Sequence, residues 1–149
     1  MIALKALSIR SPYWWFILHG QKDIENRSWH TRFRGPVLIH ASAWFDPSEV
    51  RDDFHTAREI ATGQGVTLPP VSLAELRAAG GHIVGSMTIT DCVSHSASPW
   101  FFGPQGFVLA KAKVVPRVQC KGALGLFTPA AMGEAARGSP STECERTTK

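Results

Sequence analysis

Cysteine is scarce in this chain of 149 residues, which contains only three. Cys92, Cys120 and Cys144 lie far apart, and no CxxC pair is present. The odd number argues against a disulfide framework, and the wide spacing argues against a zinc site. We therefore expect reduced thiols in a cytoplasmic protein, since disulfides are rare in that compartment.

Long apolar runs are also lacking, and none approaches the roughly 20 residues of a membrane-spanning helix. The first ten residues, "MIALKALSIR", lack the apolar stretch and cleavage site of a signal peptide. The sequence contains no HExxH, GxSxG, P-loop or dinucleotide fingerprint. We expect a soluble protein with no membrane partner, and no pattern indicates an obligate protein partner.

Charge is moderately one-sided, with 16 lysine and arginine residues against 12 aspartate and glutamate residues, a net charge of +4. A basic protein attracts anionic partners, although net charge says nothing about fold. RNA is the natural candidate partner, but many enzymes with other substrates are equally basic.

The hydrophobic pattern predicts an α+β domain built on a small barrel or strongly curved sheet of about six strands, with flanking helices. The length fits one domain, over residues 1–128, and the small polar residues of 129–149 predict a flexible tail. Strands are expected over residues 2–9, 23–29, 35–42, 82–93, 106–115 and 122–127. Helices are expected over residues 12–19, 47–62 and 73–79.

Capping residues mark where the three helices begin. Ser11 is a suitable N-cap for the first helix. Asp46 and Glu49 fit a capping box at the start of the second helix, and Ser72 and Glu75 fit one at the start of the third.

The densest group of charges is "HGQKDIENRSW", residues 19–29, directly after the apolar helix. Strand alternation places Glu25 and Arg27 on one face and Ile24 on the other, so we expect Ile24 to be buried and the charged pair to interact. Together with Lys22, these charges either lie on a solvated strand, where an ion pair is worth little, or rim a cleft.

Arg10, Trp14 and Trp15 lie around the start of the first helix. Arginine recognises phosphate with two parallel hydrogen bonds, and an indole can stack on a nucleic-acid base. For at least one of the tryptophans, plain core packing is the stronger expectation.

Four further residues could contact a nucleic acid, and each has a simpler alternative. Trp100, in "WFFGPQGF", is a stacking platform if exposed and a lid over the barrel if buried. Arg34 belongs to a basic loop, "RFRG". His40 ends a strand, where a satisfied core histidine is commoner, and Lys121 either contacts phosphate or is solvated.

Five segments in order resemble the ASCH domain of the PUA-like superfamily. They are "LSIRSPYWWFILHGQKDIENRSW", "RGPVLIHAS", "GHIVGSMTITDC", "GPQGFVLA" and "CKGALGLF", which together span about residues 7–127. The resemblance implies a small PUA-like β-barrel with a cleft beside the first helix and the GxKxxExR-like turn. It also implies a link to RNA: the family includes suspected RNA binders, some ribonucleases, and one branch that deacylates N4-acetylcytidine.

The deacylating branch uses a lysine, a threonine three residues later and a more distant glutamate. Lys22 matches the lysine, but Glu25 occupies the threonine position, and Asp91 is the nearest carboxylate to the glutamate position. The resemblance therefore does not carry that branch's mechanism over. Glu25 and Arg27 instead resemble the branch in which an ExR pair lines the cleft.

Our first hypothesis is an RNA-binding protein whose cleft cleaves single-stranded RNA. Lys22 and Arg10 would hold phosphate, Glu25 would act as a general base or a metal ligand, and Arg27 would orient it. One of the two helix tryptophans and Trp100 would stack on bases. No metal site is predicted and no cofactor is certain, although a divalent metal at Glu25 stays open.

Two alternatives remain at this point. One is an amidohydrolase acting on an acylated nucleoside such as N4-acetylcytidine, with Lys22 as base and a water guided by Glu25 as nucleophile. The other is a module that binds RNA or a modified base without turnover, with an affinity that falls as salt rises.

Overall fold

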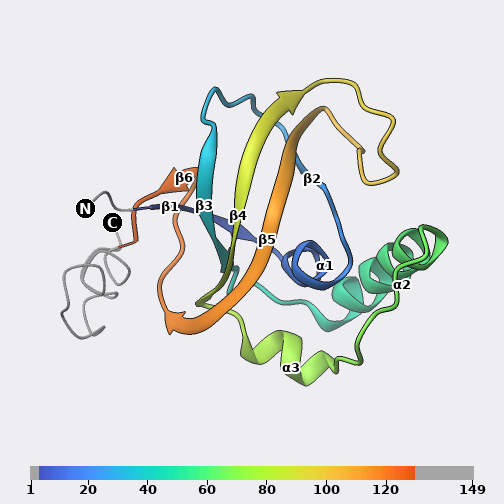
Figure 1. Ribbon diagram of the computed structural model, residues 1–149. Coiled ribbons are helices and arrows are strands. Elements are labelled where there is room, and N and C mark those ends of the chain that lie inside the picture. The colour runs from blue at the N-terminus through green and yellow to red at the C-terminus, as the bar shows by residue number, and fades with distance from the viewer. Residues whose placement is uncertain (1–3, 130–149) are drawn as a thin grey trace.

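The computed structural model describes residues 4–129, in which a curled six-stranded sheet has three helices beside it (Figure 1). The strands are β1 (Lys5–Ile9), β2 (Ile24–Arg27), β3 (Gly35–Ala41), β4 (His82–Val93), β5 (Gln105–Gln119) and β6 (Leu126–Phe127). The helices are α1 (Tyr13–His19), α2 (Pro47–Gly63) and α3 (Leu73–Ala78). The predicted α+β class and barrel-like sheet are confirmed.

The strand order is β2-β5-β4-β3-β1-β6. β1 runs parallel to β3, and every other neighbouring pair is antiparallel. The register shifts at three places between β4 and β5 and once between β3 and β4, after Ile39. Such bulges bend a strand and increase its twist, and here they help the two long central strands to curl.

Element types follow the prediction, but several bounds differ. β5 extends to Gln119, well beyond the predicted end at residue 115, while β6 is reduced to two residues. β2 ends at Arg27 rather than Trp29. Cys144 lies outside the described residues, and so does the predicted flexible tail apart from residue 129.

The helix caps are confirmed at one helix, partly confirmed at a second and wrong at the first. Ser72 and Glu75 form the predicted capping box of α3. Asp46 caps α2, but the Glu49 carboxylate pairs with Arg10. Ser11 makes no backbone cap for α1, because its hydroxyl accepts a hydrogen bond from the Trp14 indole at 2.8 Å.

Alternation along β1 and β3 gives the sheet two covered faces. Leu7 and Ile9 of β1 belong to the main core, which α1 and α2 cover. Ala6 of β1 and Leu38 of β3 point the other way and pack with Cys120 in a second, smaller cluster. The segment after β5 therefore covers the outer face of β1 and β3, and a pocket lies there.

Candidate functional site

The turn after α1 directs Lys22 into the protein. α1 ends at His19 and Gly20 is its C-cap; a Cβ atom at residue 20 would lie 2.6 Å from the Phe16 ring, so a side chain is excluded there. Gln21 follows with φ +57°, and the Lys22 amide donates back to the Phe16 carbonyl at 3.1 Å. This reversal leaves Lys22 only 3% exposed.

Polar and aromatic groups surround the Lys22 ammonium. It donates to the Ile24 carbonyl and, at 3.3 Å, to Oε1 of Glu25. The ring centroids of Tyr13 and Trp100 lie 5.6 and 6.0 Å from Nζ, within the range of cation–π attraction. Burial lowers the pKa of Lys22, and the Glu25 charge opposes that change.

Glu25 is held between two cations. Its Oε2 accepts a hydrogen bond from Nε of Arg27 at 3.1 Å and forms an ion pair with Nη2 of Arg27, also at 3.1 Å. With Glu25 only 7% exposed, the interpretation of this block as a solvated charged strand is wrong. The predicted pairing of Glu25 with Arg27 and the burial of Ile24 are confirmed.

Arg27 also connects the two edges of the curled sheet. Its Nη2 donates to the backbone carbonyl of Ser8 at 2.7 Å. β2 is one edge strand, whereas Ser8 belongs to β1, next to the other edge. β6 pairs only with Ala6 and Leu7, so Arg27 contacts β1 just beyond the end of that short strand.

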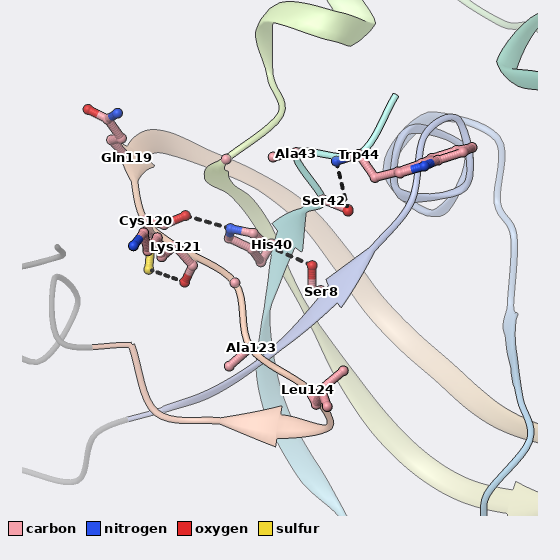
Figure 2. Close-up of a pocket in the computed structure, with 12 residues that line it drawn as sticks. Ser8, His40, Ser42, Ala43, Trp44, Gln119, Cys120, Lys121, Ala123 and Leu124 are labelled. Carbon is pink, nitrogen blue, oxygen red and sulfur yellow. Dashed lines mark hydrogen bonds between the residues drawn. The ribbon is translucent and has the colours of Figure 1, made fainter. Parts of the chain in front are cut away.

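A pocket of about 690 Å³ lies at Ser8, on the outer face of β1 and β3. Figure 2 shows Ser8 and His40 between Trp44 and Leu124, with Cys120 and Lys121 on the remaining side. The other residues that line the pocket are Ser42, Ala43, Gly81, Gln119, Gly122 and Ala123.

His40 forms two hydrogen bonds beside this pocket. Its Nδ1 lies 2.9 Å from the Ser8 hydroxyl, and its Nε2 lies 2.6 Å from the Cys120 carbonyl (Figure 2). His40 is 1% exposed, and its burial lowers its pKa; the hydrogen bond to the Cys120 carbonyl opposes this change and the charge of His82 adds to it. The ring is therefore neutral at pH 7.

Trp44 is an exposed aromatic side chain at the pocket, and sequence reasoning missed it. The indole is 44% exposed, and the Arg10 guanidinium lies 4.1 Å from its ring centroid. Arg10 also pairs with Glu49 of α2 at 3.2 Å. The available signal was a second aromatic residue, next to Phe45, in the short connection between β3 and α2.

The structure gathers three of the predicted contact residues at this pocket. His40 and Lys121 line it, and Arg10 reaches it through Trp44. Arg34 lies elsewhere, paired with Asp91 at 3.5 Å in an exposed position, and neither residue lines the pocket.

The three predicted stacking tryptophans are buried. Trp100 is 1% exposed and donates to the Gln64 side chain at 2.9 Å, as expected for a lid residue tucked into the core. Trp14 and Trp15 belong to the core cluster. Both also line part of a separate cleft of about 470 Å³. We expected at least one of the two helix tryptophans to pack in the core, and both of them do.

Residues 4–129 contain neither a cluster of metal-binding side chains nor a membrane-spanning helix. No three His, Cys, Asp or Glu side chains in this range gather where they could hold a metal ion. In the same range, no helix has the length and apolar character needed to cross a bilayer.

Comparison with known proteins identifies one family. The model of the ASCH domain matches residues 7–117, which include α1, the buried turn and most of the sheet. No curated protein matches the chain.

Proposed function

This chain belongs to the ASCH domain family, and on that premise we propose that it binds single-stranded RNA by taking an unpaired nucleotide into the pocket beside Ser8. The carrying observation is the half-exposed Trp44, held by Arg10 at the edge of a pocket that Lys121 also lines. Its volume of about 690 Å³ lies within the range of ligand pockets, about 300–1,000 Å³.

Each of these residues has a separate task in the proposed complex. Arg10 occupies one face of the Trp44 indole, and a base stacks on the other face. Lys121 and Arg10 provide positive charge for phosphate, which makes the affinity dependent on salt. Base stacking tolerates all four bases, so little sequence preference is expected.

We assign Lys22, Glu25 and Arg27 a positioning role. Lys22 and Glu25 expose only 2% and 10% of their side chains, so a polymer phosphate cannot reach them as they stand. Arg27 connects them to the Ser8 carbonyl, and the group thereby fixes the β1 wall of the pocket. Cleavage with Glu25 as base would require that carboxylate to lose a partner, so binding fits the geometry better.

Trp44→Ala tests the proposal against Phe102→Ala, which removes another exposed aromatic outside the pocket. Loss of stacking costs about 1–3 kcal/mol per base, so Trp44→Ala should weaken binding of a fluorescent oligouridylate by about 5–150-fold. Phe102→Ala should bind like the wild type. Equal affinities for the two variants in anisotropy titrations would show that the pocket is not the RNA site.

Variants of Glu25 and Lys22 distinguish the two catalytic hypotheses. RNA degradation by the wild type that is abolished in Glu25→Gln, in samples shown by circular dichroism to be folded, would restore the ribonuclease assignment. Acetate release from N4-acetylcytidine that depends on Lys22 would instead support the amidohydrolase.

A further inference from the structure

The sheet register places Ser8 and His40 side by side. They are direct partners on the parallel strands β1 and β3, so their side chains emerge on the same face. The register between β3 and β4 shifts at His40, and a bulge of this kind often re-aims a side chain. The result is the 2.9 Å contact between the Ser8 hydroxyl and Nδ1 of His40.

The partner of the other ring nitrogen fixes the direction of this hydrogen bond. The Cys120 carbonyl can only accept, so Nε2 carries the proton and donates to it. In a neutral imidazole Nδ1 then has a free lone pair, and the Ser8 hydroxyl must donate to it. Serine, histidine and an orienting oxygen thus stand in the order required for an activated hydroxyl.

The Ser8 hydroxyl is accessible from the pocket. Ser8 is half-buried and lines the cavity, whereas His40 behind it is enclosed. Residue 122 is glycine, and a Cβ atom there would lie 3.1 Å from Ser8 Oγ and 2.8 Å from His40 Cε1. A side chain at residue 122 would therefore crowd both the hydroxyl and the imidazole.

We propose that Ser8 and His40 form a nucleophile–base pair that hydrolyses carboxylic esters bound in this pocket. The apolar side chains of Trp44 and Leu124 and the cation Lys121 line the same space. They fit an ester that carries an aromatic or apolar group together with a negative charge. This activity goes beyond RNA binding and does not depend on it.

The reaction proceeds in two balanced halves. Ser8 Oγ attacks the ester carbonyl as its proton moves to His40 Nδ1, and the carbon–oxygen bond to the alcohol breaks as that proton passes to the leaving alkoxide. Water then gives a proton to Nδ1 and attacks the acyl-serine, which releases the carboxylic acid and restores the Ser8 hydroxyl. The Cys120 carbonyl holds the imidazole in its required tautomer and orientation throughout.

A fluorophosphonate probe tests the pair without knowledge of the natural ester. An activated serine attacks its phosphorus and expels fluoride, which leaves a stable adduct that intact-mass and peptide analysis locate. We expect wild-type protein to be labelled at Ser8, and Ser8→Ala to carry no adduct. Turnover of p-nitrophenyl acetate should fall at least tenfold in Ser8→Ala.

Two further variants separate activation from ordinary packing. His40→Gln keeps a donor and an acceptor but cannot take up the proton, so its labelling rate should fall at least tenfold in samples shown by circular dichroism to be folded. Ser98→Ala is the matched control, since Ser98 is also half-buried but donates to Asp23 and lies outside the pocket. It should be labelled like the wild type.

The outcomes are decisive in either direction. No adduct at Ser8, or equal labelling rates in folded His40→Gln and wild type, would show that His40 only joins β1 to the segment after β5. Labelling at Ser8 that depends on His40 would establish the pair. Neither result bears on RNA binding, which the Trp44 comparison decides.

Discussion

Arg27 donates a hydrogen bond from Nη2 to the backbone carbonyl of Ser8 at 2.7 Å. This contact joins the buried Lys22–Glu25–Arg27 group to the pocket on the outer face of the sheet, because the Ser8 side chain contacts His40 there. The charged turn and the pocket are therefore parts of one connected structure, although only the turn stands out in the sequence.

The first prediction compares two glutamates that each pair with an arginine. Glu25 pairs at 3.1 Å with 10% of its side chain exposed, and Glu49 pairs at 3.2 Å with 58% exposed. Glu25→Gln leaves Lys22 and Arg27 without their counter-charge and should lower the free energy of unfolding by about 3–5 kcal/mol. Glu49→Gln should change it by about 0–1 kcal/mol, because exposed pairs contribute little.

Urea denaturation of both variants and the wild type measures these free energies from the midpoint and slope. Similar losses in the two variants would show that the buried group contributes no more than a surface pair. The circular dichroism of folded Glu25→Gln should match the wild type, since the substitution preserves shape.

Local patterns predicted this turn because its signals lie close together in the sequence. The alternation of Ile24 and Glu25 indicated which face is buried, and the two-residue spacing indicated the Glu25–Arg27 pair. Regular strand alternation would place Lys22 on the face opposite Glu25, yet Lys22 contacts Glu25, because the reversal at Gln21 rotates it before the strand begins.

The pocket could not be predicted from local patterns, because its parts come from distant segments. Ser8 and His40 meet only through the parallel pairing of β1 and β3, 32 residues apart. Cys120 is brought to His40 by a further connection across 80 residues. His40 was expected to end a strand, and β3 ends one residue later, at Ala41, but the partners of His40 depend on a strand order that the sequence does not state.

The second prediction concerns Asn26, which holds the loop after β4. Its amide nitrogen donates to the Trp100 carbonyl at 3.0 Å, and its oxygen accepts from the Phe102 and Gly103 amides at 2.8 and 3.0 Å. Asn26→Ala removes the acceptor, so hydrogen exchange of these two amides should become faster. Asn26→Asp keeps an acceptor and should retain most of their protection.

Amide-resolved hydrogen exchange by NMR distinguishes the two variants, with the amide of Leu109 as an internal reference, since it bonds to the Asp23 backbone. Unchanged exchange at Phe102 and Gly103 in Asn26→Ala would mean that this side chain does not hold the loop.

The third prediction follows from the buried, neutral His40. Burial lowers its pKa in the folded protein, while the unfolded chain takes up a proton near pH 6.5. Between pH 6.5 and the lower folded pKa the unfolded state binds more protons, so the free energy of unfolding falls as the pH falls. The loss is about 1.4 kcal/mol for each unit by which the pKa is lowered, and it stops growing below the folded pKa.

His40→Gln lacks this titration, so its stability should decline less than that of the wild type over the same acidic range. Lys121 lines the pocket and stays in both proteins, so its own contribution cancels in the difference, whereas the interaction of His82 with His40 is part of what His40→Gln removes. Urea midpoints measured from pH 7.5 down to pH 4.5 give that difference. Parallel curves for the two proteins would show that His40 takes up its proton equally easily in the folded and unfolded states. A neutral imidazole, and with it the inferred direction of the Ser8 hydrogen bond, would then be wrong near pH 6.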